Sequence, residues 1–267
     1  MLVRFWGVRG SVPWSRRESA IFGCNTPCIE VRDEATNALL ILDAGTGIVG
    51  LGESLDHAPE AAILLSHYHW DHVQGLPFFA PFFSRGSALT IYAPALEGAS
   101  AKDVDAMFEP PHFPMSSRSL ASPPRVRLFD AGDVRIGDFH VAAAHLNHPG
   151  GAFAFRIRGS TSDLVYASDH EFGNPDADER LAAFALNSGA TIIDAHFTPE
   201  ELPAHAGWGH ASWRQATEFA SATGAGALWL FHHRPGRTDG EVEAIAAQAR
   251  RVYPAARAAR EGDVFRV

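Results

Sequence analysis

Short runs of aliphatic and β-branched residues recur along the chain, separated by polar or Gly/Pro-containing stretches. Runs of this length and composition predict β-strands. Twelve such runs are expected as strands: Leu2–Val8, Pro27–Val31, Leu39–Leu42, Ala61–Ser66, Ala88–Tyr92, Val126–Phe129, Phe139–Ala144, Ala152–Ile157, Asp163–Ala167, Thr191–Ile193, Ala227–Phe231 and Val264–Val267. Three stretches with helical spacing of apolar residues are expected as helices: Ala177–Leu186, Ser212–Ala222 and Asp239–Arg251. Helices interspersed among the strands predict a layered α/β domain over residues 1–267.

One stretch, Glu109–Pro124, is rich in proline and interrupts this pattern. Long loops in compact domains are often functional. Two interpretations stay open: the stretch 109–124 is a surface excursion, or it is a lid over a site.

The segment Ala61–His72, with the sequence AAILLSHYHWDH, places four ligand-type side chains directly after an apolar strand. Residues two apart in an extended chain point to the same side, about 6.6 Å apart, so His67 and His69 can converge on one metal ion. Asp71 and His72 follow where the chain turns, and they can face a second ion. Imidazole and carboxylate are ligands of zinc and similar metals. A lone histidine here would be an ordinary hydrogen-bonded residue, but three histidines and one aspartate within six positions favour metal binding.

Three further strand ends each deliver one ligand-type residue: His148, Asp169 and His232. Ligand sites of sheet proteins gather where strands end. Each residue alone could lie on the surface. Together with the first cluster they are expected to be metal ligands.

These motifs carry a resemblance to a known family. The run HYHWDH matches the HxHxDH signature of the metallo-β-lactamase fold hydrolases, and His148, Asp169 and His232 follow in that family's order. The resemblance implies an α/β fold, the four-layer αββα sandwich, and a dinuclear site with two divalent ions, zinc by preference and Mn or Fe as alternatives. It assigns His67, His69 and His148 to one ion, Asp71, His72 and His232 to the other, and Asp169 as the bridge.

The segment Gly207-Trp-Gly-His-Ala-Ser also resembles the Gly-His-Ser-Thr motif of the phosphodiesterase branch, which includes tRNase Z and cyclic phosphodiesterases. The resemblance implies that metal-bound hydroxide attacks phosphorus. We expect His210 to be the general acid, because imidazole titrates near neutral pH. Asp71 joins His210 as an expected catalytic residue. Asp194 would orient either His210 or a metal ligand.

Two other residues have two interpretations each. Arg9 could contact a phosphate, since guanidinium forks suit phosphate oxygens, or it could be an ordinary surface arginine. Asp43 could orient a ligand histidine, or it could bond its own backbone in a turn.

The formal net charge of −9 argues against an extended nucleic-acid surface, which would need Lys and Arg. Unlike tRNase Z, the chain shows no long Gly/Pro-rich arm for gripping tRNA. Only two cysteines are present, and no apolar run is long enough to cross a bilayer. A cytoplasmic protein that does not bind membranes is therefore expected. Its oligomeric state stays open, with a homodimer among the options.

The leading hypothesis is a dinuclear metal-dependent phosphodiesterase acting on a small or cyclic phosphodiester. An alternative is an acyl hydrolase of the same fold, acting on a lactone, a β-lactam or a thioester, which would not need His210. A second alternative is a non-catalytic metal-binding protein. The complete ligand set argues against it, since structural zinc sites are closed and usually mononuclear.

Overall fold

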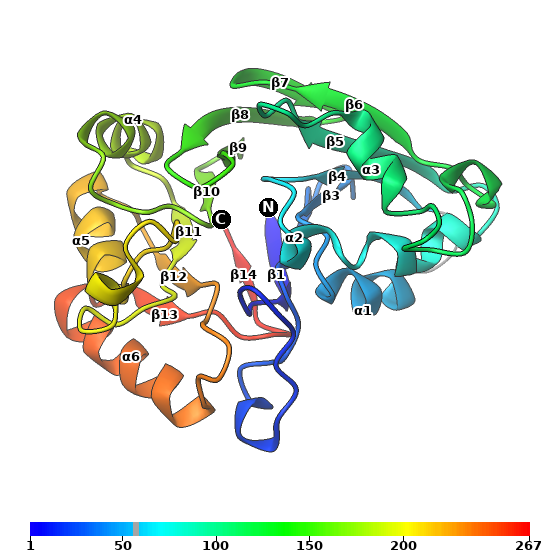
Figure 1. The fold of residues 1–267 in the computed structure, drawn as a ribbon. Helices are drawn as coiled ribbons and strands as arrows, with labels where there is room; N and C mark the ends of the chain where they lie inside the picture. The colour runs from blue at the N-terminus through cyan, green and yellow to red at the C-terminus, as the bar shows by residue number, and fades with distance from the viewer. Residues whose placement is uncertain (56–58) are drawn as a thin grey trace.

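Two β-sheets form the centre of the computed structural model, which describes residues 1–55 and 59–267 (Figure 1). The first sheet has the order β14-β1-β2-β3-β4-β5-β6, built from β1 (Leu2–Gly7), β2 (Cys28–Arg32), β3 (Leu39–Leu42), β4 (Glu60–Leu64), β5 (Ala88–Pro94), β6 (Arg125–Phe129) and β14 (Val264–Arg266). The second has the order β13-β12-β11-β10-β9-β8-β7, built from β7 (Gly132–Ile136), β8 (Phe139–Leu146), β9 (Ala152–Arg158), β10 (Asp163–Ala167), β11 (Ala190–Asp194), β12 (Leu228–Phe231) and β13 (Ala256–Ala258).

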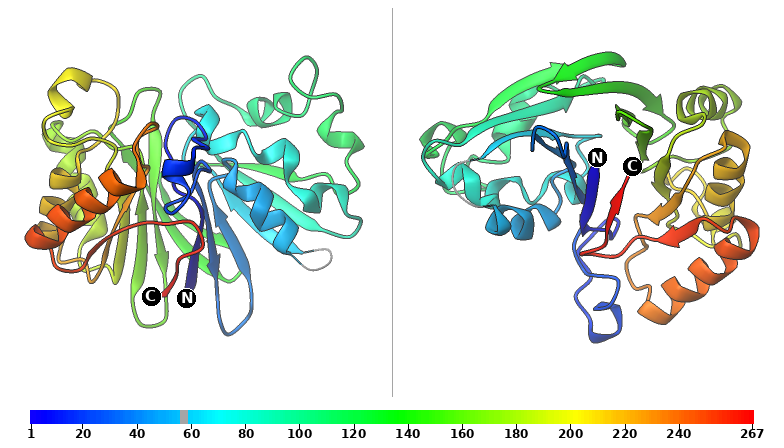
Figure 2. Two further views of the ribbon diagram at one scale, coloured as in Figure 1. Left: turned by 90° about the horizontal axis from the view of Figure 1, so that it is seen from below. Right: turned by 180° about the vertical axis from the view of Figure 1, so that it is seen from behind.

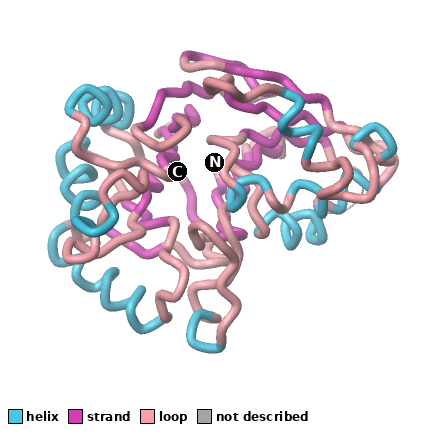
Figure 3. Tube along the Cα trace, viewed as in Figure 1, coloured by secondary structure: helices cyan, strands magenta, loops and turns pink. Residues whose placement is uncertain are grey.

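Helices lie on the outer sides of both sheets (Figure 2; Figure 3). They are α1 (Gly47–Ser54), α2 (Trp70–Val73) and α3 (Ala101–Ala106) by the first sheet, and α4 (Pro175–Ala185), α5 (Trp213–Thr223) and α6 (Asp239–Val252) by the second. Short 3₁₀ helices span Arg17–Ser19, Leu76–Phe78, Ala80–Phe83, Ser117–Ser119 and Leu202–His205. Among the described residues, no helix combines the length and apolar character that crossing a bilayer requires.

The hydrophobic core has three main layers of contact. Between the sheets, Phe5 and Leu42 of the first sheet belong to one buried cluster with Phe155 and Phe231 of the second. A second cluster joins the first sheet to its helices, and a third joins the second sheet to α4, α5 and α6. Helix, sheet, sheet and helix therefore follow one another, which confirms the predicted αββα sandwich.

Within each sheet, one half is parallel. Strands β3, β4, β5 and β6 run parallel, as do β10, β11, β12 and β13. The carboxyl ends of parallel strands lie at one edge of a sheet, where side chains from separate parts of the sequence meet. Asp43, Asp169 and His232 all follow such strand ends and have positive φ of 58°, 63° and 59°. A left-handed conformation of a non-glycine residue is costly, and it is most often kept at functional sites.

All twelve predicted strands and all three predicted helices are present. On α6, Ile245 and Ala249 are both buried, as expected of residues four apart on one face of a helix. Strands β7 and β13 and helices α1 to α3 were not predicted. In α1, Gly47 and Gly52 lower helix propensity, but a Cβ at Gly47 would lie 2.6 Å from the Trp6 carbonyl oxygen, so close packing requires glycine there.

The Pro-rich stretch 109–124 is partly packed onto the domain. Leu120 is buried, and the Ser122 N–H donates to the Phe82 carbonyl. Its role as a lid stays a prediction. His57, whose position in the sequence suggests only a structural role, lies outside the described residues.

Candidate metal centre

His67, His69 and His148 form a first histidine group at the sheet edge. The first two lie between the end of β4 and the start of α2, and His148 approaches from the loop after β8. Their ligand nitrogens lie within 4.8 Å of one another. The Nε2 atom of His148 is 3.1 Å from Nδ1 of His69. This is the combination that the resemblance to the metallo-β-lactamase fold hydrolases assigned to one ion.

Asp71, His72 and His232 form a second group beside the first. Asp71 and His72 lie on α2, whereas His232 follows β12. The Nε2 atoms of His72 and His232 are 3.3 Å apart, and an Asp71 carboxylate oxygen lies 3.0 Å from the latter. Ligand atoms of this group also lie within 4.8 Å of one another.

Asp169, which follows β10, connects the two groups. One of its carboxylate oxygens is 3.1 Å from Nε2 of His72, and the other is 3.4 Å from Nε2 of His232. It also forms a compact ligand set with His67 and His72. The fold thus brings all seven expected metal ligands together, with Asp169 in the position expected of a bridge.

The ligand atoms fit a bound cation. His72 donates through Nδ1 to Asp43, and His148 donates through Nδ1 to the Gly209 carbonyl. In the neutral imidazoles, each Nε2 therefore carries a lone pair directed at its neighbours. Among the described residues, the buried Nε2 of His67 has no hydrogen-bond partner. Buried polar atoms rarely stay unpaired, so these His/Asp clusters indicate divalent metal binding.

Asp43 orients one ligand histidine. Its carboxylate accepts hydrogen bonds from His72 Nδ1 at 2.8 Å, from the Tyr166 hydroxyl at 2.6 Å and from the Ser66 backbone N–H at 2.7 Å. A carboxylate on the outer nitrogen fixes the tautomer and the ring plane of a metal-binding histidine. Of the two interpretations of Asp43, the structure supports the orienting one.

Burial and neighbouring charges shift the pKa values of the ligand histidines in different directions. Burial lowers the pKa of His67, His69 and His148, which favours the neutral form that binds metal. Burial has the same effect on His72, but the nearby carboxylates outweigh it and raise its pKa well above the usual value. The second group is therefore rich in negative charge, which a cation would neutralise.

His210 lies beside both groups, on the loop that precedes α5. Its Nδ1 donates to the Asp194 carboxylate at 2.8 Å, and its ring centroid is 5.0 Å from that of His232. Asp194 is fully buried at the end of β11. Burial lowers the pKa of His210, but the carboxylates of Asp194, Asp169 and Asp71 outweigh this effect and raise it to about 9. Asp194 orients His210, one of the two roles expected of it.

The comparisons with known proteins agree with this geometry. A family model described as a beta-lactamase superfamily domain matches residues 39–233. The chain belongs to this superfamily.

The chain is similar along nearly its whole length to three known proteins. Ribonuclease Z of Lacticaseibacillus casei is 25% identical, over 95% of this chain and 91% of that protein. The metallo-beta-lactamase fold protein YhfI from Bacillus subtilis has a TM-score of 0.72 at 20% identity, covering 99% of this chain and 98% of its own. A diphosphatase from the PhnP family has a TM-score of 0.73 at 15% identity, covering 100% and 97%. The superfamily and the Ribonuclease Z relative point to a metal-dependent hydrolase, and the two solved structures show the shared fold.

The environment of Arg9 differs from both interpretations made from the sequence. Its side chain is fully buried, and its guanidinium donates to the carbonyls of Gly23, Arg237 and Ser19 at 2.7, 2.8 and 3.4 Å. These carbonyls replace the hydration that a buried cation loses. The guanidinium is thus committed to holding backbone segments together and is not available to a phosphate, so neither interpretation, phosphate contact or surface residue, describes Arg9.

Sequence reasoning missed two residues at the site. The ring of His196 stacks on that of His210, with centroids 4.3 Å apart, and its Nδ1 donates to the His232 carbonyl. The Glu171 carboxylate accepts the backbone N–H groups of Gly207 and Gly209, both at 2.7 Å. His196 could have been found from the sequence, because it lies two residues after the candidate Asp194. Nothing local to position 171 indicates that its partner loop lies 36 residues away.

Proposed function

We propose that this superfamily member is a dinuclear metal-dependent phosphodiesterase that hydrolyses a small or cyclic phosphodiester. Zinc is the metal we expect, with Mn or Fe as alternatives, because imidazole and carboxylate ligands suit all three. The observation that carries the proposal is the hydrogen bond between His210 and Asp194 beside two adjacent groups of metal-ligand side chains. Hydrolysis of an ester with a poor leaving group needs a proton donor at that place.

The ligand groups have separate tasks in this proposal. His67, His69 and His148 would hold one cation, Asp71, His72 and His232 the other, and Asp169 would contact both. Two cations held there would make hydroxide available at neutral pH and attract the oxygens of a phosphoryl group. Asp43 keeps His72 in the correct tautomer through Nδ1.

His210 completes the proposal as the proton donor. Because its Nδ1 donates to Asp194, its Nε2 is the atom that would give a proton to the departing alkoxide. Burial lowers the pKa of this imidazole, but the carboxylate of Asp194, which is not among the expected metal ligands, raises it and so favours the protonated donor form. The hydrogen bond also fixes the ring, so its orientation does not depend on the substrate.

The test combines metal quantification with paired substrates. We expect about two equivalents of divalent metal per chain, and faster hydrolysis of bis(p-nitrophenyl) phosphate than of a γ-lactone, measured on the same preparation. An inert phosphodiester together with rapid lactone hydrolysis would transfer the assignment to the acyl hydrolases. One equivalent of metal or none, without hydrolysis of either substrate, would support a binding protein.

A further inference from the structure

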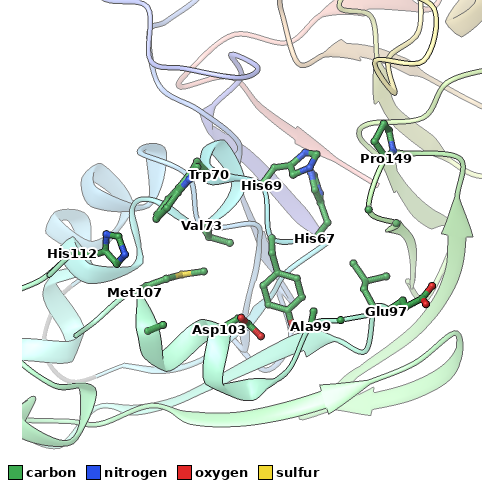
Figure 4. A pocket seen from close by; sticks show the side chains of 16 residues that line it. His67, His69, Trp70, Val73, Glu97, Ala99, Asp103, Met107, His112 and Pro149 are labelled. Carbon is green, nitrogen blue, oxygen red and sulfur yellow. The ribbon is translucent and has the colours of Figure 1, made fainter. Parts of the chain in front are cut away.

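A pocket of about 470 Å³ opens beside the first histidine group (Figure 4). His67 and His69 line it, so its contents would lie next to the candidate metal centre. The opposite walls come from the loop after β5, from helix α3 and from His112 of the Pro-rich stretch. His210 is not among the lining residues, so the pocket is separate from the proposed proton donor.

The walls of this pocket are largely apolar. Trp70, Met107 and Leu96 contribute large hydrophobic side chains, and Ala99 and Ala106 leave room between them. Trp70 is 62% exposed although it is a large apolar side chain. Concave sites with apolar walls next to a few polar groups are typical of small-molecule binding. A ring or a branched aliphatic group would cover this exposed tryptophan.

The charges of the pocket have one sign. Glu97 and Asp103 are its carboxylates, and none of the described residues that line it is lysine or arginine. Both carboxylates belong to exposed side chains. A substrate arm that carries its own phosphate or carboxylate would meet like charges without a compensating cation, which is a common way to reject a ligand.

We propose that this pocket binds an uncharged, apolar arm of the substrate, about the size of an aromatic ring, and rejects anionic arms. The inference rests on the proposed function, which places the phosphoryl group of the substrate at the metal centre held by the adjacent histidines. It narrows the substrate class to small diesters that carry one aryl-sized uncharged group. A polynucleotide, which brings a further phosphate on each side of the scissile one, does not fit this description.

Three non-hydrolysable ligands test the proposal on the metal-loaded protein by titration calorimetry. They are methylphosphonate, benzylphosphonate and 4-carboxybenzylphosphonate, which share the phosphonate and differ only in the arm. We expect benzylphosphonate to bind at least about tenfold more tightly than methylphosphonate, because the ring is buried. The 4-carboxybenzyl ligand should lose roughly tenfold relative to benzylphosphonate.

A charge variant tests the electrostatic part separately. Ala106 is exposed on α3 and lines the pocket, so Ala106→Lys adds a cation to the wall without removing a contact. It should improve binding of 4-carboxybenzylphosphonate by about fivefold relative to benzylphosphonate. The matched control is Ala244→Lys, on the exposed side of α6 and away from the pocket, which adds the same net charge and should leave the ratio unchanged.

The possible outcomes separate this inference from the proposed function. Equal binding of the methyl and benzyl ligands, tight binding of the carboxylated ligand, or no binding of benzylphosphonate would each overturn the pocket assignment. The proposed function is tested independently by hydrolysis of bis(p-nitrophenyl) phosphate. If hydrolysis fails while the phosphonate ranking holds, the pocket assignment stands and the proposed reaction falls.

Discussion

The imidazole of His210 donates through Nδ1 to the carboxylate of Asp194 across 2.8 Å, which joins the loop before α5 to the end of β11. The other Asp194 oxygen accepts the backbone N–H groups of His196 and Ala211. The carboxylate is thus fixed by the backbone, and it in turn fixes the ring. A proton donor held in this way reaches its substrate without a conformational search.

Replacing His210 by alanine should lower turnover while leaving the metal content unchanged. We expect a loss of about 10²–10⁴-fold for a diester with an alkyl leaving group, because general acid catalysis contributes that much. The loss should be smaller for bis(p-nitrophenyl) phosphate, whose leaving group needs little protonation. Steady-state rates on both substrates, with metal analysis of the same samples, provide the measurement.

The exposed His140 supplies a control, since His140→Ala should change neither quantity. His210 lies within ligand distance of His196 and His232. If the metal content of His210→Ala falls in proportion to its activity, His210 is a ligand and the proposed role is wrong.

Asp43→Asn should weaken metal binding. The amide cannot accept all the hydrogen bonds that the carboxylate receives from His72, Tyr166 and Ser66. Substitutions of residues that orient metal ligands typically cost 10–100-fold in affinity, and we expect about that loss here. Competition with a chelator measures the affinity, and the exposed Asp138→Asn is the control. Unchanged affinity would show that Asp43 serves the fold alone.

Glu171→Gln should reduce kcat about tenfold without changing the metal content, because one of the two glycine N–H groups before His210 loses its acceptor. An amide offers one oxygen where the carboxylate offers two. Glu179→Gln, an exposed change on α4, should behave like the unmodified protein. An increase in KM with unchanged kcat would place Glu171 in substrate binding and contradict the positioning role.

Glu201→Gln should destabilise the fold by about 1 kcal/mol at pH 7 and by less in acid. Burial raises the pKa of Glu201, but the Arg237 guanidinium at 2.6 Å and the Thr198 N–H outweigh it and lower the pKa below 4.5. A depressed folded pKa gives stability that is complete above the unfolded value and is lost as pH falls through the folded one. Urea unfolding of both proteins at pH 7 and pH 3.5 measures this, and a pH-independent difference would refute the ion-pair explanation.

Local patterns in the sequence predicted most of the fold. Eleven of the twelve strand runs contain buried residues, and β14 is the exception, so the apolar composition of most strands is visible without any tertiary information. Strand β7 was not predicted because apolar and polar residues alternate only weakly in Gly132–Ile136, which includes glycine, aspartate and arginine. Helix α1 was not predicted because its glycines lower helix propensity. Close packing against Trp6 and Phe79 requires these glycines, and no local sequence pattern shows that packing.

The ligand-type residues could also be read from the sequence, because each follows an apolar strand and imidazole and carboxylate have few other reasons to gather there. His67 and Asp169 are examples: their spacing and the strand pattern sufficed to single them out. Arg9 shows the limit of that reading. An arginine followed by Gly-Ser is equally compatible with an anion contact and with a buried bond to carbonyls, and only the folded chain distinguishes them.

By itself the sequence determined which side chains could bind metal and which segments form strands, because both follow from residue type and short-range spacing. Only the tertiary structure decided how closely Asp169 approaches His67 and His72, that Glu171 holds the loop before His210, and that an apolar pocket lies beside His67, with no lysine or arginine among the described residues that line it. These relationships join residues many positions apart, and their distances depend on how the sheets pack, a quantity that no local pattern encodes.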